Sequence, residues 1–239
     1  MTDVRSQKMK RLGIVGGIAP ESTIEYYRLV VACWRARVTD GSYPPLVINS
    51  IDMNRMRGLI EAGELGLLAD YLLGELRRLA DAGADFALLA SNTPHLIFEE
   101  LERRSPLPLL SIIGAALDAT AALGLGKVGL LGTRFTMQGG FYQKVFARGG
   151  VEVVTPDEAD QAYVHEKYMG EFIEGVFLDE TREALLAVVD RLKEREGVEG
   201  VVLGGTELPL ILRDPAGRGI PFLDTARIHV ERAVAEMLA

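Results

Sequence analysis

The feature that most constrains the fold of this chain is an internal repeat. Residues 11–17, which read Arg-Leu-Gly-Ile-Val-Gly-Gly, are echoed by residues 127–133, which read Lys-Val-Gly-Leu-Leu-Gly-Thr. Each copy has the length and apolar character of a buried strand that ends in a tight turn. Two halves of similar layout predict two lobes, because about 100 residues are enough for a small domain.

The spacing within each half supports this duplication. A second strand-to-helix turn follows the glycine-rich turn after 74 residues in the first half, from Gly17 to Ser91, and after 72 in the second, from Thr133 to Gly205. If a pseudo-twofold axis relates the lobes, equivalent turns face each other across a cleft. A cleft between lobes is a preferred site for a small ligand.

Apolar runs of strand length alternate with helical patterns along the whole chain. This alternation is typical of parallel sheets covered by helices on both faces, so we predict an α/β fold with two α/β/α lobes. We expect residues 11–110 plus 222–239 to form the first lobe and residues 111–221 the second. The predicted strands are residues 12–17, 46–50, 84–90, 106–113, 127–133, 151–154, 198–204 and 220–223. The predicted helices are residues 24–38, 63–82, 96–104, 114–123, 141–147, 158–175 and 180–196, with a last one from residue 225.

The second turn of each half places the start of a helix at the carboxyl end of a buried strand. In residues 91–95 (Ser-Asn-Thr-Pro-His), Thr93 suits the N-cap and Pro94 suits the first helical position. The counterpart is residues 204–209 (Gly-Gly-Thr-Glu-Leu-Pro). Backbone N–H groups at such a helix start bind carboxylates and phosphates. A further helix start is expected near residue 24, with Ser22 or Thr23 as its N-cap.

Charge and cysteine content exclude several classes of protein. The formal net charge of −8 argues against nucleic acid or an anionic membrane surface as partner, since both reward clustered lysine and arginine. No apolar run approaches the roughly 20 residues that cross a bilayer, and residues 1–10 do not resemble a secretory signal. The single cysteine, Cys33, allows no intrachain disulfide and no thiolate-rich zinc site. We therefore expect a cytoplasmic protein.

Five spaced motifs carry a family resemblance. They are Gly-Ile-Val-Gly-Gly with Pro-Glu-Ser-Thr and Tyr-Tyr in residues 13–27, Ser-Asn-Thr-Pro-His in 91–95, Leu-Gly-Thr-Arg-Phe-Thr-Met in 131–137, Gly-Gly-Thr-Glu in 204–207 and Asp-Thr-Ala-Arg-Ile-His in 224–229. In this order they resemble the aspartate/glutamate racemase family, on its branch of aspartate racemases and broad-specificity amino-acid racemases. The resemblance implies two lobes around a cleft, a homodimer, and chemistry that needs no cofactor, pyridoxal phosphate included.

The resemblance also implies two catalytic cysteines, and here the sequence departs from the family. Typical members carry Cys-Asn-Thr on one wall of the cleft and Gly-Cys-Thr-Glu on the other, where the thiols act as acid and base. The first cysteine position is Ser91 and the second is Gly205. A serine hydroxyl is a weak base unless it is activated, and glycine has no side chain. We therefore expect that the standard two-cysteine mechanism is not possible, nor that of a one-cysteine decarboxylase, because Cys33 matches neither position.

The remaining motif positions define the candidate site. The candidate catalytic positions are Ser91, the lost cysteine position at Gly205, and Glu207, which is the leading candidate base and otherwise orients the helix start. The candidate substrate-binding residues match positions that line the pocket in family members, and they are Arg55, Asn92, Thr93, Thr133, Thr136 and Thr206. Arg55 is matched by a looser alignment than the others. No metal ligands are expected. His95 and His229 are interpreted as structural, and His165 as a residue on the face of a helix. As alternatives, His95 assists Ser91, or His165 reaches the cleft.

Two functional hypotheses follow. The first is a cofactor-independent isomerase of the amino-acid racemase type, which binds a small amino or carboxylic acid between the lobes and moves a proton by divergent chemistry. The second is a homologue that keeps the binding pocket without racemising its ligand. The duplication alone does not separate the two, since a two-lobed binding protein has the same layout.

Overall fold

The chain forms two parallel four-stranded sheets with the same strand order. A computed structural model describes residues 9–213 and 218–239. The first sheet has the order β2-β1-β3-β4 and the second β6-β5-β7-β8, and all neighbouring strands run parallel. The strands are β1 (Leu12–Gly16), β2 (Leu46–Ser50), β3 (Phe86–Leu89), β4 (Leu109–Leu110), β5 (Lys127–Leu131), β6 (Glu152–Val154), β7 (Gly200–Leu203) and β8 (Phe222–Asp224). The predicted α/β class with two similar halves is confirmed.

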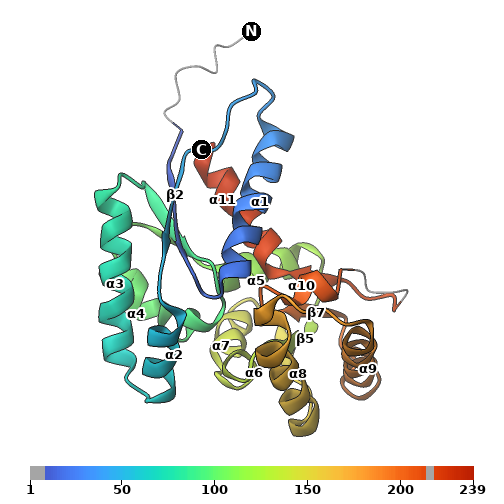
Figure 1. The fold of residues 1–239 in the computed structure, drawn as a ribbon. Coiled ribbons are helices and arrows are strands. Elements are labelled where there is room, and N and C mark those ends of the chain that lie inside the picture. The colour runs from blue at the N-terminus through green and yellow to red at the C-terminus, as the bar shows by residue number, and fades with distance from the viewer. Residues whose placement is uncertain (1–8, 214–217) are drawn as a thin grey trace.

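Helices surround both sheets, as the alternating pattern predicts (Figure 1). The α-helices are α1 (Pro20–Arg37), α2 (Met53–Glu61), α3 (Leu65–Asp81), α4 (Phe98–Arg104), α5 (Ile112–Ala122), α6 (Arg134–Gln138), α7 (Phe141–Ala147), α8 (Glu158–Gly170), α9 (Asp179–Glu196), α10 (Leu208–Ile211) and α11 (Thr225–Met237). The described part of the chain also contains the short 3₁₀ helices η2 (Thr93–Ile97) and η3 (Phe172–Glu174). No helix among the described residues is long and apolar enough to cross a membrane.

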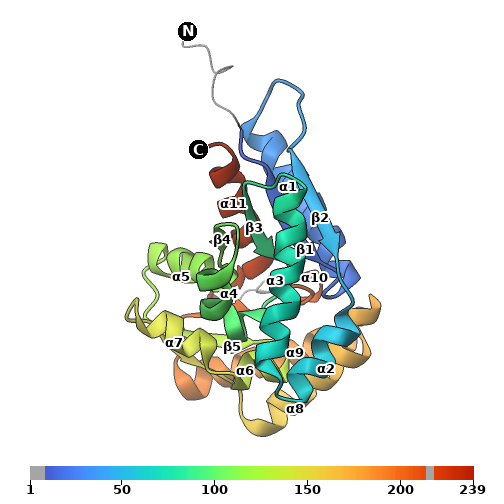
Figure 2. The same ribbon diagram turned by 90° about the vertical axis from the view of Figure 1, so that its left-hand side faces the viewer.

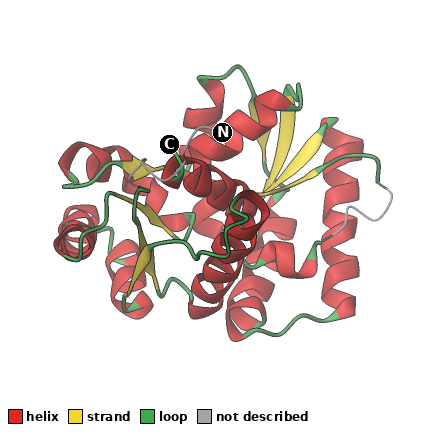
Figure 3. Cartoon of the chain, turned by 90° about the horizontal axis from the view of Figure 1, so that it is seen from above, coloured by secondary structure: helices red, strands yellow, loops and turns green. Residues whose placement is uncertain are grey.

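Each sheet is a three-layer unit whose two faces bury different side chains. In β1, Leu12 and Ile14 pack with α1 and α11, whereas Val15 packs with α2, α3 and α4 on the opposite face. In the second sheet, α5 and α7 cover one face and α8 and α9 the other. Seen from above, the strands form two separate groups enclosed by helices (Figure 3). Successive side chains of a strand point to opposite faces of the sheet, and helices cover both faces here. The strand sequences are therefore almost continuously apolar.

The strand register brings the carboxyl ends of neighbouring strands together. Leu12 of β1 lies beside Leu46 of β2 and Phe86 of β3, so the turns after these strands meet at one edge. In the second sheet, β5 lies between β6 and β7 in the same way. In Figure 2 the first sheet, with α3 and α4 beside it, occupies the upper part of the view, and β5, α6 and α8 lie in the lower part. The ends that carry the repeated turns therefore form the junction between the sheets.

Several predicted helix starts are wrong by a few residues, and tertiary contacts explain why. Helix α1 begins at Pro20 after Ala19, so neither Ser22 nor Thr23 caps it. The hydroxyl of Thr23 instead accepts a hydrogen bond of 2.7 Å from the backbone N–H of Gly17. At the Ser91 turn, Thr93 is the first residue of η2 and Asn92 precedes it, with no side-chain capping bond.

Two further segments differ from their predicted secondary structure. The predicted strand 106–113 shortens to β4, because the Ser111 side chain accepts a hydrogen bond from the N–H of Gly114 and starts α5 at Ile112. Residues 134–138, which lie outside the predicted helices, form α6 with Thr133 as N-cap. A polar sequence with a threonine before it is compatible with a helix or a turn, and propensity alone does not decide.

The division into lobes at residues 110/111 and 221/222 stays a prediction. Strand β8 pairs with β7 and belongs to the second sheet, although residues 222–239 are predicted to be part of the first lobe. The helix that follows, α11, contacts both α1 and α5. The carboxyl-terminal segment therefore joins the two halves.

Candidate active site

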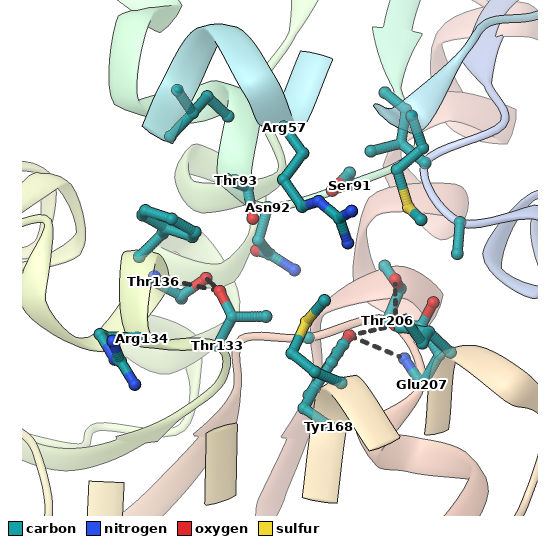
Figure 4. A pocket seen from close by; sticks show the side chains of 18 of the residues that line it. Arg57, Ser91, Asn92, Thr93, Thr133, Arg134, Thr136, Tyr168, Thr206 and Glu207 are labelled. Atoms are coloured by element: carbon teal, nitrogen blue, oxygen red, sulfur yellow. Dashed lines mark hydrogen bonds between the residues drawn. The ribbon is translucent and has the colours of Figure 1, made fainter. Parts of the chain in front are cut away.

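A pocket lies where the repeated turns of the two sheets approach one another. Its volume is about 540 Å³, within the range that holds a small organic ligand. The pocket is lined from the first half by α2 and the Ser91 turn, and from the second half by α6, α8 and the Gly205 turn. Figure 4 shows Arg57, Ser91, Asn92 and Thr93 on one side and Thr133, Tyr168, Thr206 and Glu207 on the other.

The fold brings eight of the nine predicted site residues to this pocket. They are Ser91, Asn92, Thr93, Thr133, Thr136, Gly205, Thr206 and Glu207. These residues come from three segments that are up to 116 positions apart in the chain, from Ser91 to Glu207. Their convergence follows from the parallel register, which places every strand-end turn at the same edge of its sheet.

Arg55 is the exception. Among the described residues it does not line the pocket, and its guanidinium carbon lies 4.2 Å from the centroid of the Tyr71 ring. Arg57 lines the pocket instead and forms an ion pair of 3.7 Å with Glu61. Residues two apart on a helix point to different sides, so only one of the two arginines is able to face the pocket. The sequence does not reveal which one, because it does not predict α2.

The side of the pocket formed by the Ser91 turn, called the first wall below, carries buried polar side chains. Ser91 is 7% exposed and Asn92 is 3% exposed. The Tyr142 hydroxyl donates to the Asn92 side-chain oxygen at 2.6 Å, and the Asn92 amide donates to the Thr225 hydroxyl at 3.4 Å. The Asn92 amide is thereby fixed in one orientation, beside Ser91 at the turn.

The second wall contains a buried carboxyl. Glu207 is 2% exposed, and its Oε2 accepts hydrogen bonds from the Tyr168 hydroxyl and, at 3.0 Å, from the Thr206 hydroxyl. The Ser22 hydroxyl donates to Thr206 and so links α1 to this wall. Burial raises the pKa of Glu207 above its usual value, and the hydroxyl donors offset part of that rise. A carboxyl with a raised pKa at a pocket wall suits proton transfer.

Tyr168 is the site residue that the sequence analysis missed. A Cβ atom at Gly205 would lie 2.4 Å from Cε2 of Tyr168 and 2.7 Å from its hydroxyl oxygen, so the phenol occupies the space of a side chain at position 205. Burial, and next the carboxyl of Glu207, raise the pKa of Tyr168 well above its usual value. The glycine at the second cysteine position is the one sequence signal that a neighbour fills this space.

Two histidines are held in the core, in agreement with their structural interpretation. Nε2 of His95 accepts a hydrogen bond of 3.2 Å from the N–H of Ile112, and burial lowers the pKa of His95 to about 3. Nε2 of His229 donates to the carbonyl of Leu110 at 3.0 Å, and its Nδ1 accepts from the Tyr26 hydroxyl at 2.9 Å. Burial lowers the pKa of His229 to about 4.

His165 lies nearer the site than its interpretation as a helix-face residue predicts. It lines the pocket, and its Nδ1 accepts a hydrogen bond of 3.3 Å from the backbone N–H of Arg134. Burial lowers its pKa. Cys33 is half-buried on α1 and, among the described residues, does not line the pocket. No cluster of three or more His, Cys, Asp or Glu side chains suited to a metal ion occurs within residues 9–213 and 218–239.

Two similar parallel-sheet halves with a pocket of polar and apolar side chains at their junction define an α/β protein with a site for a small molecule. Sequence comparison gives the family. The family model of the Asp/Glu/hydantoin racemases matches residues 15–233, so the chain belongs to that family. The broad specificity amino-acid racemase RacX of Bacillus subtilis is 24% identical over 241 residues, which cover 95% of this chain and 98% of that protein.

Solved structures support the same family. The chain is similar to a candidate Asp/Glu racemase from Yersinia pestis, with 33% identity, a TM-score of 0.88, and coverage of 97% of this chain and 100% of the other. It is also similar to an aspartate racemase homologue from Pyrococcus horikoshii, with 34% identity, a TM-score of 0.83, and coverage of 96% and 99%. Both likenesses extend over nearly the whole chain and so include both sheets.

Proposed function

We propose that this protein binds a small amino acid or related carboxylic acid in the pocket and isomerises it by moving the proton on its α-carbon, without a cofactor. Family membership and the similarity to the broad specificity amino-acid racemase of Bacillus subtilis support an amino-acid substrate. The observation that carries the proposal is Glu207, a buried carboxyl with a raised pKa on one wall of the pocket, opposite Ser91 and Asn92.

Ligand binding draws on groups from both walls. Arg57 is suited to hold a carboxylate, because a guanidinium offers two parallel hydrogen bonds to its oxygens. Asn92, Thr93, Thr133, Thr136 and Thr206 supply neutral donors and acceptors. The apolar side chains of Ile18, Met56, Phe135 and Met169 complete the lining, so the pocket also suits a substrate with an apolar side chain.

The proton chemistry in this proposal differs from the two-cysteine mechanism. Ser91 and Gly205 stand at the two positions where typical family members have cysteine, so neither wall offers a thiol. We assign the proton transfer to the groups that remain, with Ser91 on the first wall and the Glu207 carboxyl on the second. A carboxyl works as a general base when its pKa lies near the operating pH, and burial shifts Glu207 in that direction.

One observation favours a second candidate function. The Tyr168 ring covers the backbone of Gly205, so an aromatic ring fills the second cysteine position and no thiol is present there. This suits a protein that binds an amino or carboxylic acid without racemising it.

Proton exchange in deuterated water separates these functions. The protein is incubated with each enantiomer of methionine, leucine, aspartate and glutamate, and loss of the α-proton signal is followed by NMR. Exchange with inversion supports a racemase, and exchange with retention supports one-sided proton transfer. A ligand that raises the thermal unfolding midpoint without exchange supports the binding protein. If none of these ligands exchanges or raises the midpoint, both candidate functions are rejected.

We further propose that the protein works as a homodimer in the cytoplasm. The family resemblance supports a dimer, and the net charge of −8 supports a partner other than nucleic acid or an anionic membrane. Sedimentation velocity at micromolar concentration tests the dimer, and a single species of monomer mass contradicts it.

A further inference from the structure

Tyr168 and Gly205 form a matched pair at the second cysteine position. The phenol lies against the Gly205 backbone so closely that a Cβ atom there would be 2.9 Å from Cζ as well as in contact with the hydroxyl. Tyr168 is 5% exposed, and its ring packs edge-on against Phe172 with centroids 5.7 Å apart. The ring is therefore held in place and is not a surface side chain that happens to point inward.

The hydroxyl of Tyr168 is the polar end of this pair, and it lines the pocket. It donates a hydrogen bond to Oε2 of Glu207 and accepts one of 3.5 Å from the backbone N–H of Glu207. The same Oε2 also accepts from Thr206. Both side-chain donors are neutral hydroxyls, so the carboxylate keeps an affinity for a proton that an arginine partner would remove. A phenol proton and an acceptor for it therefore lie next to each other at the wall.

We propose that the Tyr168 hydroxyl is the proton-transfer group of the second wall and that Glu207 is the acceptor of its proton. The assignment rests on the proposed α-proton chemistry and names the atom that performs it in place of the missing thiol. Tyr168 is thus a catalytic residue that touches the substrate, and Glu207 acts through it.

The transfer is a relay that leaves the phenol neutral. The Cα–H bond of the substrate breaks, and its electron pair stays on the substrate, delocalised into the carboxylate. The phenol oxygen takes this proton while its own proton passes to Oε2 of Glu207, which becomes a neutral carboxylic acid. The return step reverses both transfers. No free phenolate forms, so the strongly raised pKa of Tyr168 does not oppose the relay, and the raised pKa of Glu207 favours it.

The test compares Tyr168→Phe with the wild-type protein in the deuterium exchange experiment, using both enantiomers of methionine and aspartate. Phenylalanine keeps the ring that packs against Gly205 and Phe172 and removes only the oxygen. In Tyr168→Phe we expect the α-proton of one enantiomer to exchange at least about 100-fold more slowly than in the wild-type protein. The other enantiomer, whose α-proton is removed at the Ser91 wall, should exchange near the wild-type rate. The control Tyr163→Phe removes a hydroxyl from the same helix at a residue outside the pocket lining and is expected to exchange normally.

Glu207→Gln separates the relay from a structural role. Glutamine keeps an oxygen that accepts the Tyr168 hydrogen bond but does not take up its proton, so the relay predicts the same one-sided loss of exchange. If Tyr168 only supports the wall and Glu207 takes the α-proton directly, Glu207→Gln loses exchange but Tyr168→Phe keeps it. If neither residue moves the proton, both variants exchange normally. Unchanged exchange in folded Tyr168→Phe or Glu207→Gln overturns the assignment alone. No exchange by the wild-type protein overturns the proposed isomerase and the assignment together.

Discussion

The hydroxyl of Tyr142 donates a hydrogen bond of 2.6 Å to the side-chain oxygen of Asn92. Tyr142 lies on α7, which covers the second sheet, and Asn92 follows β3 of the first. Both side chains are buried, at 0% and 3% exposed. This bond therefore crosses between the two halves and holds a pocket residue on the first wall.

Removing this hydroxyl is expected to destabilise the protein. Tyr142→Phe leaves the buried Asn92 oxygen without its donor, and an unsatisfied buried acceptor costs about 1–3 kcal/mol. Urea unfolding measures the free energy of unfolding. The control is Tyr27→Phe, because Tyr27 is 48% exposed on α1 and its loss should change little. Equal stability of the two variants would contradict a structural role for the bond.

A second prediction concerns the contact between Gly205 and Tyr168. Gly205→Ala places a methyl group 2.4 Å from a ring carbon, and such overpacking costs about 1–3 kcal/mol. The cost should shrink when Tyr168→Ala is added, because the cavity then accepts the methyl group. A double-mutant cycle from denaturant unfolding measures this coupling. Gly170→Ala is the control, since no atom lies within 4 Å of its Cβ position, and additive energies would argue against the contact.

Much of the fold could be predicted from the internal repeat. The echo of residues 11–17 in residues 127–133 corresponds to β1 and β5, the second-position strands of two sheets with identical order. The turns at Ser91 and Gly205 then had to lie at equivalent sheet edges. Because strand ends in a parallel sheet share an edge, their side chains could be assigned to one pocket before any contact was known.

The missing parts depend on tertiary contacts that leave no local pattern. Tyr168 reaches Gly205 from a helix that ends 35 residues earlier, and no periodicity encodes that approach. Serine is a residue type favoured at helix N-caps, yet the Ser22 hydroxyl donates a hydrogen bond to Thr206 across the junction. The choice between Arg55 and Arg57 needs the rotational phase of α2, which a stretch of nine residues with two arginines does not fix.

A third prediction follows from the position of the single cysteine. Cys33 is half-buried on α1, apart from the pocket lining, and burial raises the pKa of its thiol. Thiolates are the reactive form, so alkylation by iodoacetamide should be slow and should leave the α-proton exchange rate unchanged. Mass spectrometry confirms the extent of modification. Loss of exchange in proportion to alkylation would contradict the assignment of proton transfer to oxygen groups.

A fourth prediction concerns acid stability. His229 has its pKa lowered from 6.5 to about 4 by burial, so between these values the unfolded chain binds the proton and the folded protein does not. Stability is therefore lost as the pH falls from 6.5 to 4, at up to about 1.4 kcal/mol per pH unit. His229→Gln should remove this share of the slope in urea unfolding at several pH values, while the share of His95, whose pKa burial lowers to about 3, stays. His165→Gln, at a partly exposed position, should remove much less, and equal slopes in all three proteins would refute the prediction.

The last prediction distinguishes the two arginines of α2. Arg57 lines the pocket and Figure 4 shows its guanidinium directed into it, whereas Arg55 stacks on Tyr71 outside the lining. If Arg57 holds the substrate carboxylate, Arg57→Gln removes a charged hydrogen bond worth about 1.5–3 kcal/mol, which corresponds to roughly 10- to 100-fold weaker binding. Arg55→Gln should bind normally.

Isothermal titration calorimetry with an amino acid that exchanges, and with its carboxamide, measures both effects. The carboxamide lacks the negative charge, so its binding should fall less in Arg57→Gln than that of the acid. This comparison separates loss of charge recognition from a change in pocket shape. Equal weakening for acid and carboxamide would mean that Arg57 contributes packing. Weaker binding in Arg55→Gln alone would mean that Arg55, the arginine predicted by the looser alignment, holds the substrate carboxylate.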